Sequence, residues 1–323
     1  MIMEVVRGIQ NLSRSLIHPV VTIGNFDGVH LGHQKIIGIA VEKARKRNGT
    51  AVAYTFRPHP QAALRPELNL QLLLTYDEKL EFLAECGLDI TVEEPFSREF
   101  SSLSPEQFFL DILMRRLSPE AIVVGYDFAF GKGRRGHLET LGDFCKRAGV
   151  ELTVVPQVEG VSSTRIRQHL AAGEVEVANR LMGREFFYQG NVIRGEARGK
   201  KLGFPTANFK IESKLTLPFG VYATYSFCRE LRGEQPLPSV TNVGISPTFV
   251  KPGQTPVPLV ETHLLDTTLD LYGNRLEVRF LKRLREEKKF IGPNAIEELR
   301  AQIAKDAQEA REEARLSFLR LRQ

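Results

Sequence analysis

Along the first half of the chain, short apolar runs alternate with segments in which apolar residues recur every three or four positions. The short runs predict buried strands, and the other segments predict helices with one apolar face. Their alternation predicts parallel strands joined by right-handed helical crossovers, which is a doubly wound α/β domain. The expected strands are 20–23, 51–56, 90–92, 121–124 and 150–155, with an edge strand and a turn within 1–14.

Residues typical of helix ends mark where some of the helices should begin and end. Thr75 and Glu78 have the spacing of a capping box in a helix expected over 73–86. Ser104 stands before Pro105, an arrangement typical of a helix start. Asn48 and the glycine after it are expected to end the helix that begins at Leu31 and is completed by residues 36–47.

From Phe186 onward, helical spacing gives way to close apolar runs separated by glycine, proline and asparagine, which predicts an antiparallel β-barrel. The runs are 186–192, 204–209, 221–227, 239–243, 259–264 and 276–280. A final helix is expected from Asn294, with an apolar stripe packed on the barrel. The stripe comprises Ile296, Leu299, Ile303, Ala307, Ala310 and Ala314. The expected domains are therefore residues 1–183 and 184–323, and the fold class is α/β plus β.

Composition limits the partners and the location of the protein. A length of 323 residues fits two domains, and the net charge of +5 suits polyanionic small molecules, although charge alone leaves nucleic acid open. No apolar run reaches membrane-spanning length, and the N-terminus lacks a signal-peptide core, so no membrane partner is expected. Cys86, Cys145 and Cys228 are isolated and odd in number, which favours the reducing cytoplasm.

Residues 22–33, TIGNFDGVHLGH, carry the clearest chemistry of the first half. They read as the end of a buried strand, a glycine-rich turn and the first turn of a helix. His30 and His33 lie one turn apart at the helix start, where backbone N–H groups and the helix dipole favour phosphate. Two imidazoles there could donate hydrogen bonds to charge that builds on a transferring group. The same pair also fits surface histidines or an accidental metal pair.

Two other segments of the first half follow strand ends. Pro58 and His59 stand in the loop RPHP, which follows the expected strand 51–56. Open α/β sheets bind ligands at the carboxyl ends of their strands, so this loop is a candidate ligand site. A rigid turn with an incidental histidine explains the same residues. Residues 125–136, GYDFAFGKGRRG, contain GxGxxG. A dinucleotide site is rejected because six residues separate the strand from the first of these glycines, which open no helix. The basic loop with Lys132, Arg134 and Arg135 suits phosphates, and a glycine-rich hairpin is the alternative.

After the last strand of this half comes SSTRIR, residues 162–167. Three hydroxyls and two arginines at a helix start form a compact candidate anion site. Ordinary helix capping with solvated arginines explains the same residues equally well.

Two constellations of the second half suggest phosphoryl chemistry. In GKKLGFPTANF, residues 199–209, the spacing is wrong for a Walker loop. Thr206 and Asn208 lie on one side of a strand and offer oxygens for Mg²⁺ and phosphate. In the strand VETHL, alternation places Glu261 and His263 on one face. Glu261 alone would also fit an exposed strand carboxylate.

Taken together, these motifs resemble one family over almost the whole chain. HLGH and SSTRIR resemble the two signatures of the Rossmann-like nucleotidylyltransferase superfamily, and they stand about 130 residues apart. With GNFDG, FRPHP, GYDFAFG, FPTAN and ETH, the chain resembles the bacterial bifunctional riboflavin kinase/FMN adenylyltransferases, also called FAD synthetases. One departure is Lys200, where arginine is usual, which keeps the charge but loses the bidentate fork.

The resemblance implies a role for each matching residue. It implies that Glu261 is the base for riboflavin phosphorylation, that His30 and His33 serve adenylyl transfer, and that Thr206 and Asn208 hold Mg²⁺. Binding of ATP is implied for Gly24, Phe26, His30, His33, Asp127, Ser162, Ser163, Thr164, Arg167, Gly199, Thr206 and Asn208. Binding of flavin is implied for Pro58, His59, Asp306 and Arg311, although structural ion pairs explain the last two equally well.

The implied function is the conversion of riboflavin to FMN and of FMN to FAD, with ATP as co-substrate and Mg²⁺ as cofactor. The alternative is a nucleotidylyltransferase of single activity with a barrel that only binds. A nucleic-acid-binding barrel is disfavoured, because the second half lacks stacking aromatics interleaved with a basic stripe. The expected partners are small molecules, and the sequence leaves oligomerisation open.

Overall fold

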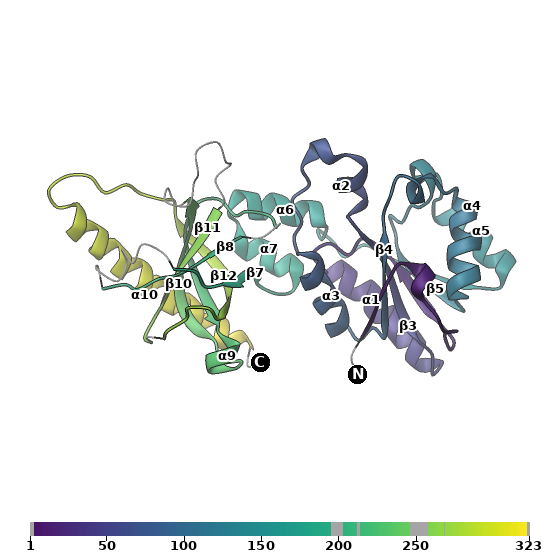
Figure 1. The fold of residues 1–323 in the computed structure, drawn as a ribbon, viewed down its shortest axis with the longest axis horizontal. Helices are drawn as coiled ribbons and strands as arrows, with labels where there is room; N and C mark the ends of the chain where they lie inside the picture. The colour runs from purple at the N-terminus through teal and green to yellow at the C-terminus, as the bar shows by residue number, and fades with distance from the viewer. Residues whose placement is uncertain (1–2, 195–202, 212–213, 246–257, 268, 322–323) are drawn as a thin grey trace. The chain divides into compact units, whose positions relative to one another are not determined.

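The computed structural model describes residues 3–194, 203–211, 214–245, 258–267 and 269–321. The chain divides into two compact units, residues 1–163 and 164–323 (Figure 1). Gly199 and Lys200, singled out from the sequence, lie outside the described residues.

A six-stranded parallel sheet forms the centre of the described part of the first unit (Figure 1). The strand order is β1-β4-β3-β2-β5-β6, and each neighbouring pair runs parallel. The strands are β1 (Glu4–Arg7), β2 (Val20–Ile23), β3 (Ala51–Arg57), β4 (Ile90–Pro95), β5 (Ala121–Gly125) and β6 (Glu151–Val155). All the strands expected from the sequence are present, and the N-terminal strand lies at an edge.

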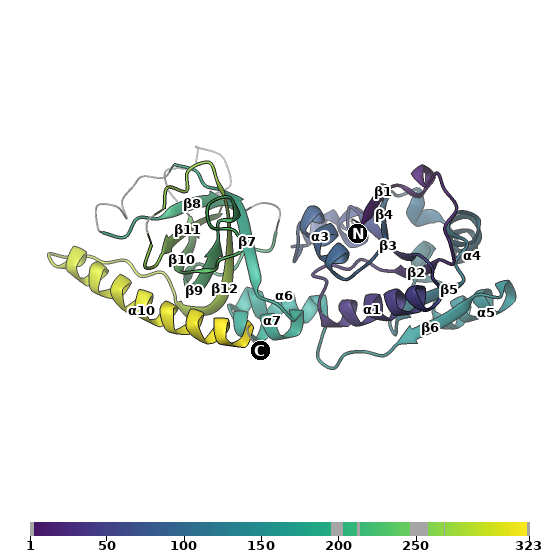
Figure 2. The same ribbon diagram turned by 90° about the horizontal axis from the view of Figure 1, so that it is seen from below.

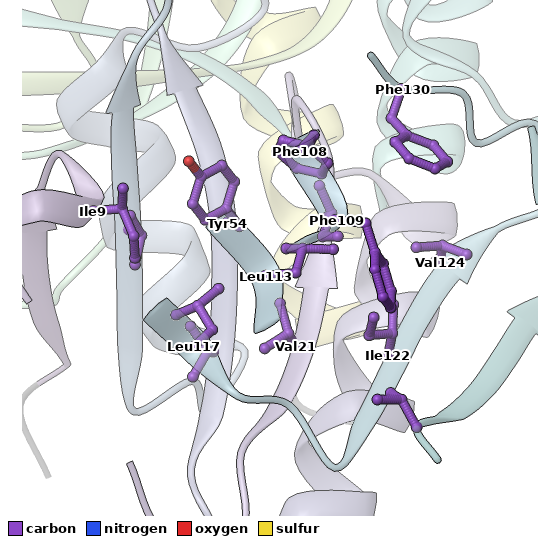
Figure 3. Packing of buried hydrophobic residues seen from close by; sticks show 14 of the residues in the cluster. Ile9, Val21, Tyr54, Phe108, Phe109, Leu113, Leu117, Ile122, Val124 and Phe130 are labelled. Atoms are coloured by element: carbon purple, nitrogen blue, oxygen red, sulfur yellow. The ribbon is translucent and has the colours of Figure 1, made fainter. Parts of the chain in front are cut away.

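Helical segments cover both faces of this sheet, which confirms the doubly wound fold. On one face, α1 (Leu31–Lys46) buries Ile37, Ala40 and Ala44. On the other face, apolar residues of alternate strand positions pack against the π-helical segment η4 (Phe108–Leu117), and this core is shown in Figure 3. The remaining helices are α2 (Pro60–Leu64), α3 (Tyr76–Glu85), α4 (Pro105–Gln107) and α5 (Leu138–Ala148), with short turns at η1 (Ile9–Asn11), η2 (Pro66–Leu68), η3 (Phe100–Ser102) and η5 (Lys132–Arg134).

Two helix starts carry the caps that the sequence predicts. Thr75 and Glu78 form a capping box in α3, and Ser104 caps α4 with Pro105 as its first residue. The helix α3 is shorter than the expected 73–86, because the backbone of Thr75 is extended and this residue caps the helix, which therefore starts at Tyr76. The backbone N–H of Leu73 donates to the buried Asp27 carboxylate at 3.0 Å.

The second unit contains an antiparallel β-barrel. Its strand order is β7-β12-β9-β10-β11-β8, and a bridge between Ile193 and Asn208 joins the end of β7 to β8. This bridge closes the sheet into the barrel that the sequence predicts. The strands are β7 (Phe186–Asn191), β8 (Ala207–Lys210), β9 (Gly220–Phe227), β10 (Leu237–Ile245), β11 (Pro258–Leu264) and β12 (Arg275–Arg285), with helices α6 (Ser163–Ala172), α7 (Val175–Met182), α9 (Arg229–Arg232) and α10 (Ala295–Leu321).

The C-terminal helix α10 runs along the barrel (Figure 2). Ala307, Ala310 and Ala314 are buried against a cluster that includes Ala223 and Val240. The expected stripe is correct for these alanines and wrong for Ile296, which is 61% exposed. The small alanine side chains allow α10 to pack closely on the strands. Ile296 belongs to the first turn of α10, which is not packed in this way.

Candidate active sites

The histidine turn, residues 24–33, joins the central strand β2 to α1. His30 is the N-cap of α1, and its Nδ1 accepts the backbone N–H of His33 at 3.4 Å. The two imidazoles stack with ring centroids 3.6 Å apart, and the ring of Phe26 meets His33 edge-on at 5.4 Å. Because Nδ1 of His30 accepts, the proton of the neutral imidazole belongs on Nε2, which makes that atom a donor.

The backbone of the histidine turn is unusual. Phe26, Gly28 and Val29 have φ values of 50°, 86° and 34°, and positive values are rare for bulky or β-branched residues. Gly28 suits its positive φ because it has no Cβ, and a Cβ there would also lie 2.7 Å from Cδ1 of Leu73. Strain of this kind persists where the surrounding structure fixes the backbone, and it concentrates at functional sites.

A buried aspartate, Asp27, connects the histidine turn to two other segments of the first unit. Asp27 is 4% exposed, its carboxylate accepts from the N–H of Leu73, and its backbone oxygen accepts the hydroxyl of Ser163 at 2.9 Å. The structure therefore brings Ser163 of the SSTRIR motif to the histidine turn. Ser162 lies just before α6 and is partly buried, and Thr164 and Arg167 lie within that helix.

A cavity of about 530 Å³ opens beside the histidine turn. Its walls come from the segments at the carboxyl ends of β2, β3, β4 and β5, which is where doubly wound sheets bind ligands. Ile23 and Asn25, on either side of Gly24, form part of the wall. The aromatic lining residues are Phe56, Phe96, Phe100, Phe108, Phe128 and Phe130.

The polar part of the cavity wall includes His59, Gln61, Arg65 and Arg134. His59 is thus placed at the cavity, whereas Pro58 directly precedes it and is not among the lining residues described. Sequence reasoning missed Arg65, Phe96 and Phe100. The signal that could have found them is their position after the carboxyl ends of β3 and β4.

The loop after β5 is a glycine-rich hairpin that also lines the cavity. Phe130 and Gly136 exchange backbone hydrogen bonds of 2.9 and 3.0 Å, so the hairpin alternative is correct for this part of the loop. Gly131 and Arg134 face the cavity, and Asp127 is exposed just after the strand.

In the barrel, a carboxylate lies between two amides across three neighbouring strands. Glu261 of β11 pairs directly with Asn208 of β8 and with Asn242 of β10. Residues that pair directly in an antiparallel sheet present their side chains on the same face. The buried Oδ1 of Asn208 has no hydrogen-bond partner among the described residues. Asn242, which sequence reasoning did not select, donates to Glu287 at 3.2 Å.

His263 contacts the segment that leads into β8, next to the row of Asn208, Glu261 and Asn242. Its Nδ1 lies 2.7 Å from the carbonyl of Pro205, the residue before Thr206. The strand alternation expected for Glu261 and His263 is confirmed, because both residues pair with the same neighbouring strand β10 at positions two apart.

Asp306 and Arg311 form ion pairs with different partners. Asp306 is 4% exposed and accepts from Arg285 at 2.8 Å and from Gln302. Arg311 donates to Asp266 at 2.8 Å, and this hydrogen bond lowers the pKa of the Asp266 carboxyl. These contacts match the structural ion pairs that the sequence left open as an alternative.

Comparison with known proteins relates both halves of the chain to known families. A family model described as FAD synthetase matches residues 13–168, and one described as riboflavin kinase matches residues 182–314. The bifunctional riboflavin kinase/FMN adenylyltransferase of Escherichia coli K12 is 38% identical, over 96% of this chain and 97% of its own. The protein of the same name from Bacillus subtilis is 38% identical, over 90% of this chain and 91% of its own.

A crystal structure named as a macrolide-efflux protein from Streptococcus pneumoniae has the same fold. It aligns with a TM-score of 0.84 at 29% identity, over 96% of this chain and 99% of its own. Within the described residues, no helix is both long enough and apolar enough to cross a membrane. Because these two relatives are 38% identical to the chain over nearly its whole length, the chain belongs to the family of bifunctional riboflavin kinase/FMN adenylyltransferases.

Proposed function

We infer that this chain is both a riboflavin kinase and an FMN adenylyltransferase. The first reaction transfers the γ-phosphate of ATP to riboflavin and yields FMN and ADP. The second joins FMN to the AMP part of another ATP and releases pyrophosphate. The observation that supports this inference is that each unit has its own candidate site for phosphate chemistry. One is the histidine turn beside an aromatic cavity, and the other is the row of Asn208, Glu261 and Asn242 in the barrel. Feeding riboflavin and FMN separately to the purified chain tests the two reactions.

For adenylyl transfer, the aromatic cavity is the proposed flavin site. Phenylalanine rings favour the planar isoalloxazine ring, and His59 and Arg65 supply polar contacts at the wall. The FMN phosphate attacks the α-phosphorus of ATP as the bond to pyrophosphate breaks. His30 and His33 donate hydrogen bonds to the charge that builds on the phosphates. The remaining proposed ATP contacts are Gly24, Phe26, Asp127, Ser162, Ser163, Thr164 and Arg167, and Pro58 is a proposed flavin contact.

For phosphorylation, Glu261 is the proposed general base. The 5′-hydroxyl of riboflavin gives its proton to the carboxylate while its oxygen attacks the γ-phosphorus, and ADP leaves. The geometry around Glu261 favours the catalytic barrel over the alternative of a barrel that only binds. Asp306 and Arg311 remain proposed flavin-side residues in this unit, acting through the ion pairs that fix α10.

The residues of the barrel site fit a magnesium ion. The buried Oδ1 of Asn208 lacks a hydrogen-bond partner among the described residues, and amide and hydroxyl oxygens are hard ligands. Asn208 and Thr206 would hold the ion together with ATP phosphates. When bound, Mg²⁺ supplies neutralisation of phosphate charge.

We therefore expect Asn208→Ala to lower riboflavin phosphorylation by at least about 10- to 100-fold, the loss that is typical even of residues that only support a metal ligand. The Mg²⁺ concentration needed for half-maximal phosphorylation should rise, and adenylylation of supplied FMN should not change. Magnesium titrations of both activities measure this, with Lys210→Ala on the same strand as a control. An unchanged magnesium requirement in Asn208→Ala would contradict the assignment.

The domain boundary near residue 183 remains a proposal, and it leads to a test with fragments. Residues 184–323 should fold alone and phosphorylate riboflavin. However, Asn179 of α7 donates to the carbonyl of Phe280 and accepts from the N–H of Phe186, both at 2.8 Å. Each such bond is worth about 1 kcal/mol, so the fragment 164–323 should be the more stable of the two.

Thermal unfolding and a kinase assay of both fragments check this expectation. Kinase activity in 164–323 together with an inactive, unfolded 184–323 would move the boundary to the N-terminal side of α7. Inactivity of both fragments, with an active full chain, would contradict an autonomous kinase unit.

The proposed partners are the small-molecule substrates alone, without nucleic acid or membrane. The cytoplasm is the proposed location, since the three cysteines, all within the described chain, form no disulfide.

A further inference from the structure

Lys79 is a buried lysine of the first unit that the reactions above do not use. It belongs to α3 and is 5% exposed. Its Nζ donates to the hydroxyl of Thr55 at 3.1 Å and to the carbonyl of Phe56 at 3.2 Å. Lysine is almost never buried unless its charge has partners. The surroundings of this ammonium therefore call for a physical explanation.

The hydrogen bonds of Lys79 lead directly to the walls of the flavin cavity. Phe56, whose carbonyl accepts from Nζ, lines the cavity. Thr55, which also accepts from Nζ, donates its own hydroxyl to the carbonyl of Asn25 at 3.3 Å, and Asn25 lines the cavity as well. One ammonium thus connects the end of β3 to the start of the histidine turn.

Charged groups face Lys79 from each of the surrounding segments. Asp27 of the histidine turn and Glu93 of β4 attract it, and Arg57 of β3 opposes it. Both carboxylates are buried, and Oε1 of Glu93 has no hydrogen-bond partner among the described residues. Arg57 lies 3.6 Å from the other oxygen of Glu93. The ammonium therefore helps Arg57 and the backbone N–H of Leu73 to offset two buried negative charges.

An aromatic ring completes the surroundings. The ring centroid of Tyr76, on the same helix, lies 5.4 Å from Nζ, and the Tyr76 hydroxyl accepts the N–H of His59, another cavity residue, at 2.9 Å. The side of α3 that carries Lys79 therefore contacts the cavity wall directly at Phe56 and His59. It reaches Asn25 only through the hydroxyl of Thr55.

We propose that Lys79 is a positioning residue for adenylyl transfer, whose charged ammonium holds the histidine turn and the flavin cavity in their working arrangement. The proposal rests on the proposed function of that cavity. It assigns Lys79 no contact with substrate. A displacement of reacting groups by 1 Å can cost about 100-fold in rate, so the loss of this connection should be visible in catalysis.

The charge of Lys79 gives the proposal a signature in pH. Burial lowers the pKa of Lys79 to about 8, although Glu93 and Asp27 oppose the decrease. The lysine is charged below pH 8 and loses its proton above it, so adenylylation should decline as the pH rises through this value. Between about pH 8 and 10.5 the unfolded chain binds more protons than the folded chain, so the lysine makes the free energy of unfolding rise with pH. Activity and stability should therefore change in opposite directions.

The test compares wild type with Lys79→Met, which keeps the length and removes the charge, and with Lys79→Arg, which keeps a charge that does not titrate in this range. In Lys79→Met we expect kcat/KM for FMN to fall by about 10- to 100-fold, with riboflavin phosphorylation unchanged in the same preparation. The alkaline decline of adenylylation should be absent from Lys79→Met and should move to higher pH in Lys79→Arg.

Two results would overturn the positioning role. One is wild-type kcat/KM for FMN in folded Lys79→Met, and the other is an alkaline decline that persists unchanged in both variants. If Lys79→Met does not fold, the wild-type profile decides, because adenylylation with no decline near pH 8 contradicts a working charge on Lys79. Failure of the proposed function looks different, since the wild type itself would then form no FAD from FMN at any pH.

Discussion

Glu261→Gln is expected to lower riboflavin phosphorylation by about 10²–10⁴-fold, the range for losing a general base. The amide keeps the shape of the side chain on β11 but cannot take the proton of the 5′-hydroxyl. Binding of riboflavin should change little, because the loss falls in the transition state, so KM should stay near its wild-type value. Steady-state kinetics with riboflavin as the varied substrate measures both parameters.

Two controls make the result for Glu261 specific. The same purified variant should convert supplied FMN to FAD at the wild-type rate, since that chemistry belongs to the other unit. Glu286→Gln, which changes a carboxylate whose side chain is 85% exposed, should leave phosphorylation unchanged. Near-wild-type phosphorylation by Glu261→Gln would contradict the role of Glu261 as general base and would leave it an ordinary strand carboxylate.

His33→Ala is expected to slow FAD formation by about 10²–10³-fold, as for the loss of one transition-state donor. The variant keeps the cap of α1, because the cap uses only the backbone N–H of His33. His30→Ala would remove both the donor and the cap. His30→Asn is the better variant, because asparagine is a good N-cap and separates the imidazole chemistry from the helix start.

The kinase activity of each histidine variant is the internal control. Phosphorylation of riboflavin should stay normal in His33→Ala and His30→Asn, and the exposed His137→Ala should leave both activities intact. Equal loss of both activities in the same variant would mean that the histidines serve folding rather than adenylyl transfer.

Local sequence patterns determined most of the architecture. Buried parallel strands need continuous apolar residues, so runs such as 121–124 are visible without tertiary information. The six close runs of the second half correspond to β7 to β12 because turns between antiparallel strands require glycine, proline or asparagine. Helix caps can be predicted in the same way, because Thr75 and Ser104 each cap a helix through a residue only three positions further along the chain.

The sites could be predicted only where their residues stand together in the sequence. The histidine turn is one continuous segment, and so is the strand with Glu261. The cavity is assembled from four strand ends, so Phe96, Phe100 and Arg65 become neighbours only after the sheet has formed. The role of Lys79 could not be predicted for the same reason, since its partners Thr55 and Asp27 come from separate segments of the chain. The exposed Ile296 shows the reverse case, in which a periodic stripe continues beyond the surface that buries it.

A time course with riboflavin as the only flavin supplied tests the central claim, that one chain carries out both reactions. Purified protein, ATP and Mg²⁺ are incubated, and the flavins are separated by chromatography. The account predicts that FMN accumulates first and that FAD follows, with ADP and pyrophosphate as the other products. Riboflavin that remains unchanged, or FMN that never becomes FAD, would contradict it.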